Sequence, residues 1–322
     1  MTERYALMLD GAGGAVALDP DGPMPAPPEG GFLWMHVMQA AGAPSDWLTA
    51  LGGSAAVEAA LMAEETRPRC TVLDETVLLN LRGVNLNPGA QPEDMVSLRI
   101  WAGARQIVTV TRREVQALGD LRERSEAGKA PLGPADMIAR LALRLADRAE
   151  PVVAELNERI DDLEEDVSEG HGMPLRRALT DIRRVSIVLR RYMFPQRDAL
   201  STLEIEDLPW VGRAERSSLR EATERVTRLA EELDAIRDRA QVVHEHMMDS
   251  RAEQMNRQML LLSVVAAIFL PLGLFTGLLG INVGGMPGAD DERAFWIVTA
   301  GLVVIGLGLV WIFRRVGFLG RR

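Results

Sequence analysis

The stretch LLLSVVAAIFLPLGLFTGLLGIN (260–282) decides how this chain is organised. From Leu260 to Gly280 it has 21 residues without a charged side chain. A helix needs about 20 apolar residues to cross a bilayer core of ~30 Å. A second uncharged run, 294–313, follows after a short loop. We therefore predict two transmembrane helices, at 259–280 and 294–313, and a water-facing region before them.

The charges that flank these spans predict their orientation. Arginines precede the first span and follow the second, in the tail 314–322, whereas the loop 281–293 carries Asp290, Asp291 and Glu292. Lys and Arg favour the cytoplasmic side of a membrane. We expect a multi-pass protein of the bacterial inner membrane with both termini in the cytoplasm and the acidic loop outside.

Bulk composition excludes some classes of function. The net charge of −10 over 322 residues argues against a nucleic-acid partner and suits a surface that concentrates cations. Cys70 is the only cysteine, which excludes an intrachain disulfide and a zinc-finger pattern. The N-terminal MTERYALMLDG (1–11) lacks the pattern of a signal peptide, so membrane insertion is expected to rely on the C-terminal spans.

The first 150 residues predict a cytoplasmic α/β domain. Segments of strand length (5–9, 15–18, 32–38, then 71–86, 95–102 and 106–112) are separated by turns rich in Gly, Pro and Asp. We expect the later ones to pair antiparallel, and helices at 44–51, 55–63, 114–127 and 135–148. No Gly-rich phosphate loop or nucleophile elbow is present, so we predict neither an enzyme nor a bound cofactor.

Residues 151–212 predict a hairpin of two charged helices. The helix at 152–169 is strongly acidic, and the one that begins at Pro174 carries pairs of arginines at heptad spacing. An internal pair held by salt bridges explains both patterns. An acidic face that gathers metal ions near a pore mouth is the alternative, and the two can coexist.

The region 213–258 predicts a stalk helix with a coiled-coil seam. Its apolar residues recur by three and four: Leu219, Ala222, Val226, Leu229, Leu233, Ile236, Ala240, Val243 and Met247. No Gly or Pro interrupts the chain from Arg213 to Pro271, so the stalk is expected to continue into the first span. We hypothesise that movement of the water-facing region passes to the membrane along this one helix.

One face of the first span is a candidate pore lining. Its members share helical spacing: Met259, Leu262, Ser263, Ala266, Leu270, Gly273, Thr276 and Gly277. If this face lines a lumen, Met259 and Leu262 form apolar rings that can close a channel by dewetting. The glycines by themselves fit close helix packing as well as pore lining.

The end of the first span resembles a known family. Gly280-Ile281-Asn282 is similar to the Gly-x-Asn signature of the CorA-type divalent metal ion transporters, and Ile268 to Leu272 and Arg190 to Pro195 look like that family as well. Leu279 and Gly288 stand where the magnesium branch has Tyr and Glu. Thr276 to Gly285, Thr66 to Cys70 and Leu81 to Gly89 resemble the ZntB-like zinc branch instead.

The resemblance implies a homopentamer in lipid around a central pore, with the first span inside. A ring of Asn282 amides at the outer mouth would meet a hydrated dication through its coordinated water. Asp290, Asp291 and Glu292 would raise the local cation concentration. The resemblance also implies proton coupling, although the spans contain no ionisable residue.

Direct zinc ligands are hard to find in the sequence. Zinc prefers Cys and His, and the candidates are Cys70, His36, His171, His244 and His246. His244 and His246 lie about 200° apart around a helix, so they do not share a face. We interpret each of these residues first as an ordinary polar or packing residue.

Four functional readings remain open. The leading one is zinc uptake through a pentameric pore, with coupling to H⁺. A passive Mg²⁺, Co²⁺ or Ni²⁺ channel and zinc efflux are alternatives. A membrane-anchored coiled-coil scaffold or sensor explains the seam and the anchor but leaves Asn282 and the acidic loop without a role.

Overall fold

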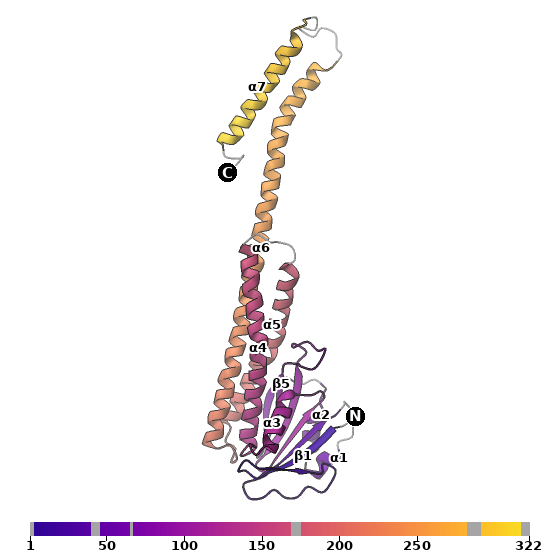
Figure 1. The fold of residues 1–322 in the computed structure, drawn as a ribbon, viewed down its shortest axis with the longest axis vertical. Coiled ribbons are helices and arrows are strands. Elements are labelled where there is room, and N and C mark those ends of the chain that lie inside the picture. The colour runs from indigo at the N-terminus through magenta and orange to yellow at the C-terminus, as the bar shows by residue number, and fades with distance from the viewer. Residues whose placement is uncertain (1–2, 40–45, 65–66, 169–174, 282–290, 317–322) are drawn as a thin grey trace. The chain divides into compact units, whose positions relative to one another are not determined.

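The computed structural model describes residues 3–39, 46–64, 67–168, 175–281 and 291–316. The chain divides into two compact units, Met1–His244 and Glu245–Arg322. Figure 1 shows the elements of each unit.

The first unit begins with a seven-stranded sheet in the order β2-β1-β3-β7-β6-β5-β4. Its strands are β1 (Glu3–Leu9), β2 (Ala15–Leu18), β3 (Phe32–Met38), β4 (Arg69–Leu73), β5 (Thr76–Gly83), β6 (Val96–Gly103) and β7 (Gln106–Thr111). Strands β5, β6 and β7 pair antiparallel in succession, as expected, but the segment predicted at 71–86 is divided into β4 and β5, which pair antiparallel with each other. The β3–β7 pair is parallel, which the sequence analysis did not anticipate.

Apolar side chains alternate along the strands and bury both faces of the sheet. Helices α1 (Asp46–Ala50) and α2 (Ala55–Met62) cover one face, where Leu61 joins a core with Met35 and Val108. The other face packs against the helices that follow. There a Cβ on Gly83 would lie 2.7 Å from Leu145 Cδ2, so a larger residue would force the Leu145 side chain to move.

Helices α3 (Gln116–Glu126), α4 (Pro134–Ser168) and α5 (Leu175–Ile205) follow the sheet, and α6 (Arg213–Leu279) and α7 (Ala294–Arg315) complete the chain. The prediction of separate helices at 135–148 and 152–169 is wrong, since α4 continues through Pro151. An internal proline removes a hydrogen bond and costs about 3 kcal/mol. Ala149 and Val153 on either side are fully buried, and this burial offsets the cost.

The predicted seam of α6 is confirmed as a buried stripe, from Leu219 to Met247. Its partners include helices of the same chain: Arg239 of α6 pairs with Glu164 of α4, and Arg190 of α5 pairs with Asp234 of α6. Helices α4 and α5 contribute their own buried stripes, which contain Leu156 and Ile160 on α4 and Leu179, Ile182 and Leu189 on α5. The seam is therefore part of a three-helix bundle within one chain (Figure 1).

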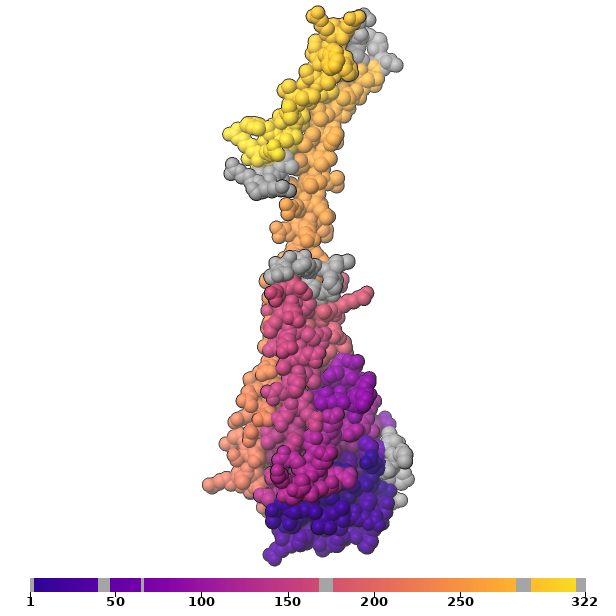
Figure 2. Space-filling model, in the orientation of Figure 1, coloured from indigo at the N-terminus to yellow at the C-terminus, as the bar shows by residue number. Residues whose placement is uncertain are grey.

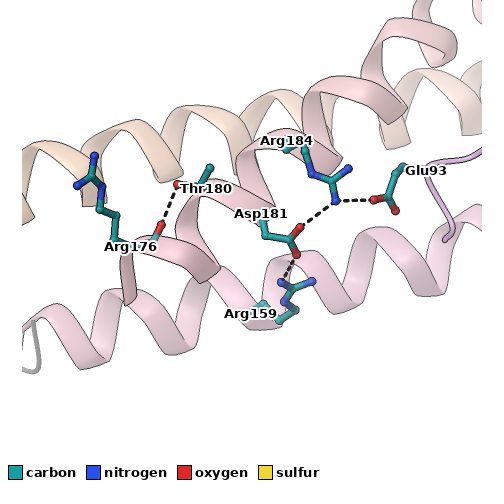
Figure 3. Close-up of polar contacts among 6 residues, drawn as sticks. All are labelled: Glu93, Arg159, Arg176, Thr180, Asp181 and Arg184. Atoms are coloured by element: carbon teal, nitrogen blue, oxygen red, sulfur yellow. Dashed lines mark hydrogen bonds and ion pairs between the residues drawn. The ribbon is translucent and has the colours of Figure 1, made fainter. Parts of the chain in front are cut away.

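The charges of α4 and α5 pair differently from the predicted acidic-to-basic match. Between these two helices Arg159 of α4 bonds to Asp181 of α5 at 2.9 Å, which is the opposite sense. Asp181 also accepts a bond from Arg184, and Arg184 reaches Glu93 in the β5–β6 connection at 2.7 Å (Figure 3). The two arginines lower the pKa of Asp181 by hydrogen bonding to its carboxylate. The acidic residues Asp161 and Glu164 instead bind Arg239 on α6.

Candidate functional site

The second unit contains the two apolar helices. The C-terminal part of α6 and the whole of α7 are long and apolar enough to cross a membrane, and almost none of their apolar residues is buried in a single chain. In Figure 2 their side chains stand exposed along both helices. Exposed apolar surface of this extent has to be covered by lipid or by other copies of the chain.

One side of the α6 span faces its neighbour α7. Val264 is the only buried residue among the described residues of the two spans, with 6% of its surface exposed. Ile268 and Leu272, four and eight positions further, are half-buried. A Cβ on Gly306 of α7 would lie 3.8 Å from Leu272 Cδ1, so the helices approach each other closely there. This side of α6 is therefore occupied within the chain.

The predicted pore face lies on the opposite side of α6. At 100° per residue, Met259, Leu262, Leu270 and Gly273 all point more than about 100° away from Val264. Met259, Leu262 and Leu270 are 56%, 68% and 74% exposed. The other members of the predicted face are exposed as well: Ser263, Ala266, Thr276 and Gly277. This face is free in one chain and apolar, which fits contact with other copies around a lumen.

The Thr276 hydroxyl is directed back to its own helix. Its Oγ1 donates to the carbonyl oxygens of Leu272 and Gly273, at 3.0 and 3.1 Å. A hydroxyl bonded in this way satisfies itself within the helix and leaves mainly a methyl group outward. Thr276 thus makes the predicted face less polar than a threonine with a free hydroxyl would.

Gly280 marks the end of the span. Its N–H donates to the carbonyl oxygens of Thr276 and Gly277, at 2.9 and 3.2 Å. A Cβ at this position would lie 3.0 Å from Thr276 O, so a larger residue would displace the helix end. Ile281 follows and is 53% exposed. Asn282, the predicted ion-entry residue, lies outside the described residues, as does Asp290.

The described part of the acidic loop has a structural role. The Asp291 side chain accepts a hydrogen bond from the Arg293 N–H at 2.9 Å, and the Asp291 carbonyl accepts from Ala294 N–H at 3.0 Å. These bonds satisfy N–H groups at the start of α7 that have no partner within the helix. Glu292 is exposed. Both carboxylates add negative charge next to the start of the second span.

The candidate zinc ligands do not assemble into a site among the described residues. Within the described ranges no three His, Cys, Asp or Glu residues are grouped so that they could hold a metal ion. Burial raises the pKa of the Cys70 thiol to about 11, and the charge of Glu206 adds to this effect. The thiolate is the form that binds metal, so Cys70 is poorly suited as a ligand. His171 lies outside the described residues, His244 is half-buried and His246 is exposed.

His36 is a buried histidine held by hydrogen bonds. Trp34 Nε1–H donates to Thr109 Oγ1 at 3.0 Å, and the same hydroxyl oxygen lies 2.9 Å from His36 Nδ1 but 3.4 Å from Met35 O. The Thr109 hydroxyl and His36 Nδ1 are therefore hydrogen-bonded to each other inside the sheet. Burial, assisted by the charge of Arg122, lowers the pKa of His36 to about 4. His36 is thus neutral at physiological pH, and its Nδ1 is already occupied.

Two features of the first unit were missed in the sequence analysis. One is the chain of charges from Glu93 through Arg184 and Asp181 to Arg159, in which Glu93 is 8% exposed. The other is Arg99, a strand residue that is 1% exposed. The only signal for Arg99 in the sequence is a charge within the apolar run MVSLRIWA (95–102), which does not reveal its neighbours.

Comparisons with known proteins cover nearly the whole chain. The family model described as "CorA-like Mg2+ transporter protein" matches residues 29–315. A divalent cation transporter named CmaX from Pseudomonas aeruginosa is 41% identical over 292 residues, which are 89% of this chain and 87% of that protein. A zinc transport protein named ZntB from Pectobacterium atrosepticum is 34% identical over 312 residues, 97% of this chain and 94% of that protein.

The fold agrees with these matches. The solved structure of a full-length CmaX protein superimposes with a TM-score of 0.79 at 38% sequence identity. The superposition covers 97% of this chain and 96% of that one, so the sheet, the long helices and the two apolar helices all have counterparts.

Proposed function

The chain belongs to the CorA-like Mg2+ transporter family, and from this premise we propose that it carries zinc ions inward across a bacterial inner membrane. The family is one of transporters of divalent cations and not of enzymes. The chain is accordingly a divalent cation transporter with two transmembrane helices. The relatives named as zinc transport proteins, which match 97% of the chain, support zinc as the substrate.

The observation that carries the proposal is the exposed face of α6 from Met259 to Gly277. Two helices of one chain cannot enclose an aqueous path, so a pore needs several copies. In our proposal five copies form a ring in the lipid, with α7 outside and the face opposite Val264 turned toward the lumen. The exposure of Met259, Leu262 and Leu270 in a single chain supports this arrangement.

The ion would enter at the ring of Asn282 amides. A neutral amide oxygen accepts hydrogen bonds from the polarised water around a dication without the tight binding of a carboxylate ring. Asp290, Asp291 and Glu292 would raise the cation concentration at this outer mouth. Rings of Met259 and Leu262 at the cytoplasmic end would form the gate.

The orientation and the coupling complete the proposal. The arginines before α6's apolar part and after α7 favour cytoplasmic termini. A proton gradient would drive uptake, but residues 260–280 contain no ionisable side chain. The proton would therefore have to act through the outer loop, the first unit or the metal's own water.

A second candidate is a passive channel for several dications, including Mg²⁺, Co²⁺ and Ni²⁺. The relative named as a divalent cation transporter is 41% identical to this chain, a higher identity than the 34% of the zinc transport protein described above. That identity supports broad selectivity. The two candidates share the pore and differ in ion preference and in dependence on protons.

Metal flux into liposomes tests the proposal. The purified full-length protein is reconstituted with a zinc-sensitive dye and a pH probe inside, and Zn²⁺, Mg²⁺ and Co²⁺ are added separately with and without an inward proton gradient. Wild type is compared with Asn282→Ala. Thr299→Ala is the matched control, because its hydroxyl donates to Phe295 O within α7 and takes no part in the proposed path.

The outcomes separate the candidates. Zinc entry that rises with the proton gradient and is lost in Asn282→Ala, but not in Thr299→Ala, supports coupled zinc uptake. Flux of all three ions without dependence on pH favours the passive channel. If no ion moves in an Asn282-dependent way while the protein assembles normally, the pore model is wrong.

A further inference from the structure

Arg99 is a fully buried cation in the middle of the sheet. It lies on β6 with 1% of its surface exposed, and its Nη2 donates to the carbonyl oxygen of Ala63, the residue that follows α2, at 2.8 Å. Its Nε and Nη1 have no hydrogen-bond partner among the described residues. Buried polar groups without partners are rare in proteins, and buried charges are normally paired.

The charged groups that act on Arg99 are cations as well. Arg112 donates to the same Ala63 oxygen at 3.2 Å and to Met62 O at 3.1 Å, so the two guanidinium groups are neighbours. Burial, together with the charges of Arg112 and Arg82, lowers the pKa of Arg99 to about 10. A group with this pKa stays protonated at neutral pH. Within the described ranges no carboxylate forms an ion pair with Arg99.

A second orphaned donor points the same way. Trp101 is two residues further along β6, so its side chain lies on the same face as Arg99. It is 5% exposed, and its indole Nε1–H has no hydrogen-bond partner in the described structure. Asn80 of β5 is directly opposite Arg99 in register and is 7% exposed. Arg99 and Trp101 thus place three donor nitrogens without acceptors on this face in the described part of the chain.

A purely structural role accounts for only part of this arrangement. Arginines near a helix C-terminus bind the last carbonyl oxygens and interact favourably with the helix dipole, as Arg99 Nη2 and Arg112 do at the end of α2. That role leaves Nε and Nη1 of Arg99 and the Trp101 indole without acceptors. Water could accept the hydrogen bonds, but it would not neutralise two adjacent charges.

We propose that this face of the sheet binds a small inorganic anion at the Arg99 guanidinium, with Trp101 and Arg112 beside it. The ligand is a hydrogen-bond acceptor with a negative charge, such as chloride or phosphate, that receives the Nε–H and Nη1–H groups. The anion neutralises the desolvated arginines and ties β6 and β7 to the end of α2. It is a resident of the first unit, independent of the transported cation.

Anion-dependent stability of the full-length protein tests this site. Thermal unfolding of the purified protein in detergent is measured in gluconate buffer at constant ionic strength, with increasing chloride in one series and phosphate in another. A ligand that binds only the folded state raises the unfolding temperature in proportion to the logarithm of its concentration. We expect a rise of about 5 °C at an anion concentration of roughly 100 times the dissociation constant.

Variants assign the effect to Arg99. Arg99→Met should lose the dependence on anions, whereas Arg69→Met, which removes an exposed arginine from β4, should keep it. The anion series that raises the unfolding temperature, chloride or phosphate, identifies the ligand. An equal dependence in wild type and Arg99→Met contradicts the proposal.

A direct measurement covers the case in which Arg99→Met does not fold. Crystals of the wild-type protein grown or soaked in bromide should show an anomalous peak within hydrogen-bond distance of Arg99 Nε or Nη1. Tetrahedral density at the same place, in crystals grown with phosphate and without chloride, also supports the site. Water alone at these atoms in every salt overturns it.

Discussion

Substitution of Arg184 by Met tests the chain of charges that joins the sheet to the helical bundle. Arg184 Nη2 bonds to Glu93 Oε1 at 2.7 Å and to Asp181 Oδ1 at 2.9 Å (Figure 3). The Glu93 side chain is 7% exposed, whereas that of Arg184 is 55% exposed. Removal of the arginine leaves a nearly buried carboxylate without its cationic partner.

The expected cost follows from these exposures. Breaking a fully buried ion pair costs about 3–5 kcal/mol, because one charge stays behind uncompensated. Arg184 is half in water, which screens the pair, so we expect about 2 kcal/mol in the free energy of unfolding. Asp181 keeps its bond to Arg159 at 2.9 Å and adds little to the loss. For a unit of this size the unfolding temperature should fall by about 4–8 °C.

Thermal unfolding of the full-length protein, followed by tryptophan fluorescence, measures the effect. Arg183→Met is the control, because Arg183 is exposed on the same helix, and it should change stability by less than about 0.5 kcal/mol. The double variant Glu93→Gln/Arg184→Met should recover at least half of the loss, since a neutral amide is less costly to bury than a carboxylate. Equal effects of Arg183→Met and Arg184→Met, or no recovery in the double variant, would refute the reasoning.

Four further predictions concern other parts of the chain. The pKa of His36 is lowered to about 4, below its ordinary value of 6.5, so the unfolded chain binds the extra proton first and stability should fall as the pH decreases from about 6.5 to 4. The loss is at most about 3 kcal/mol, and His36→Gln should flatten the stability curve measured over this pH range. Leu262→Ser should raise metal leak into liposomes several-fold by wetting the proposed gate, whereas Leu261→Ser, on another face, should leave the flux within about two-fold; equal leak in both contradicts the gate. Gly280→Ala introduces a Cβ 3.0 Å from a backbone carbonyl oxygen, so flux should fall at least about two-fold at unchanged yield, and unaltered flux would show that the helix end tolerates displacement. Arg239→Met removes bonds to partially exposed carboxylates, so the free energy of unfolding should fall by only about 1 kcal/mol, and by less at high salt. A fall of more than about 3 kcal/mol would mean that water screens this contact far less than its exposure implies.

Much of the candidate site could be predicted because it depends on local sequence. Helical spacing places Met259, Leu262 and Leu270 on one face whatever surrounds the helix, and the structure confirms that these side chains are exposed in a single chain. The structure adds that α7 approaches α6 from the other side, at Leu272. The roles of the pore face and of Asn282 stay predictions, and Asn282 lies outside the described residues.

Sequence by itself determined the features that need only a run or a period. Hydropathy gives the two spans, the absence of Gly and Pro from Arg213 up to Pro271 gives the unbroken passage of the stalk helix into the first span, and spacing by three and four gives the buried stripe of α6 from Leu219 to Met247. Each of these is a property of neighbouring residues, because a helix brings only residues three or four positions apart onto one face.

The tertiary structure decided which distant groups meet. The stripe of α6 is packed within its own chain, β3 pairs parallel with β7, and Arg184 finds Glu93 across 91 positions. Sequence spacing contains no information about such pairs, since their partners depend on how the whole sheet and bundle pack. For the same reason the sequence could not predict the proposed anion site at Arg99. A charged residue in a strand can bind an anion only when its surroundings leave its donors without acceptors.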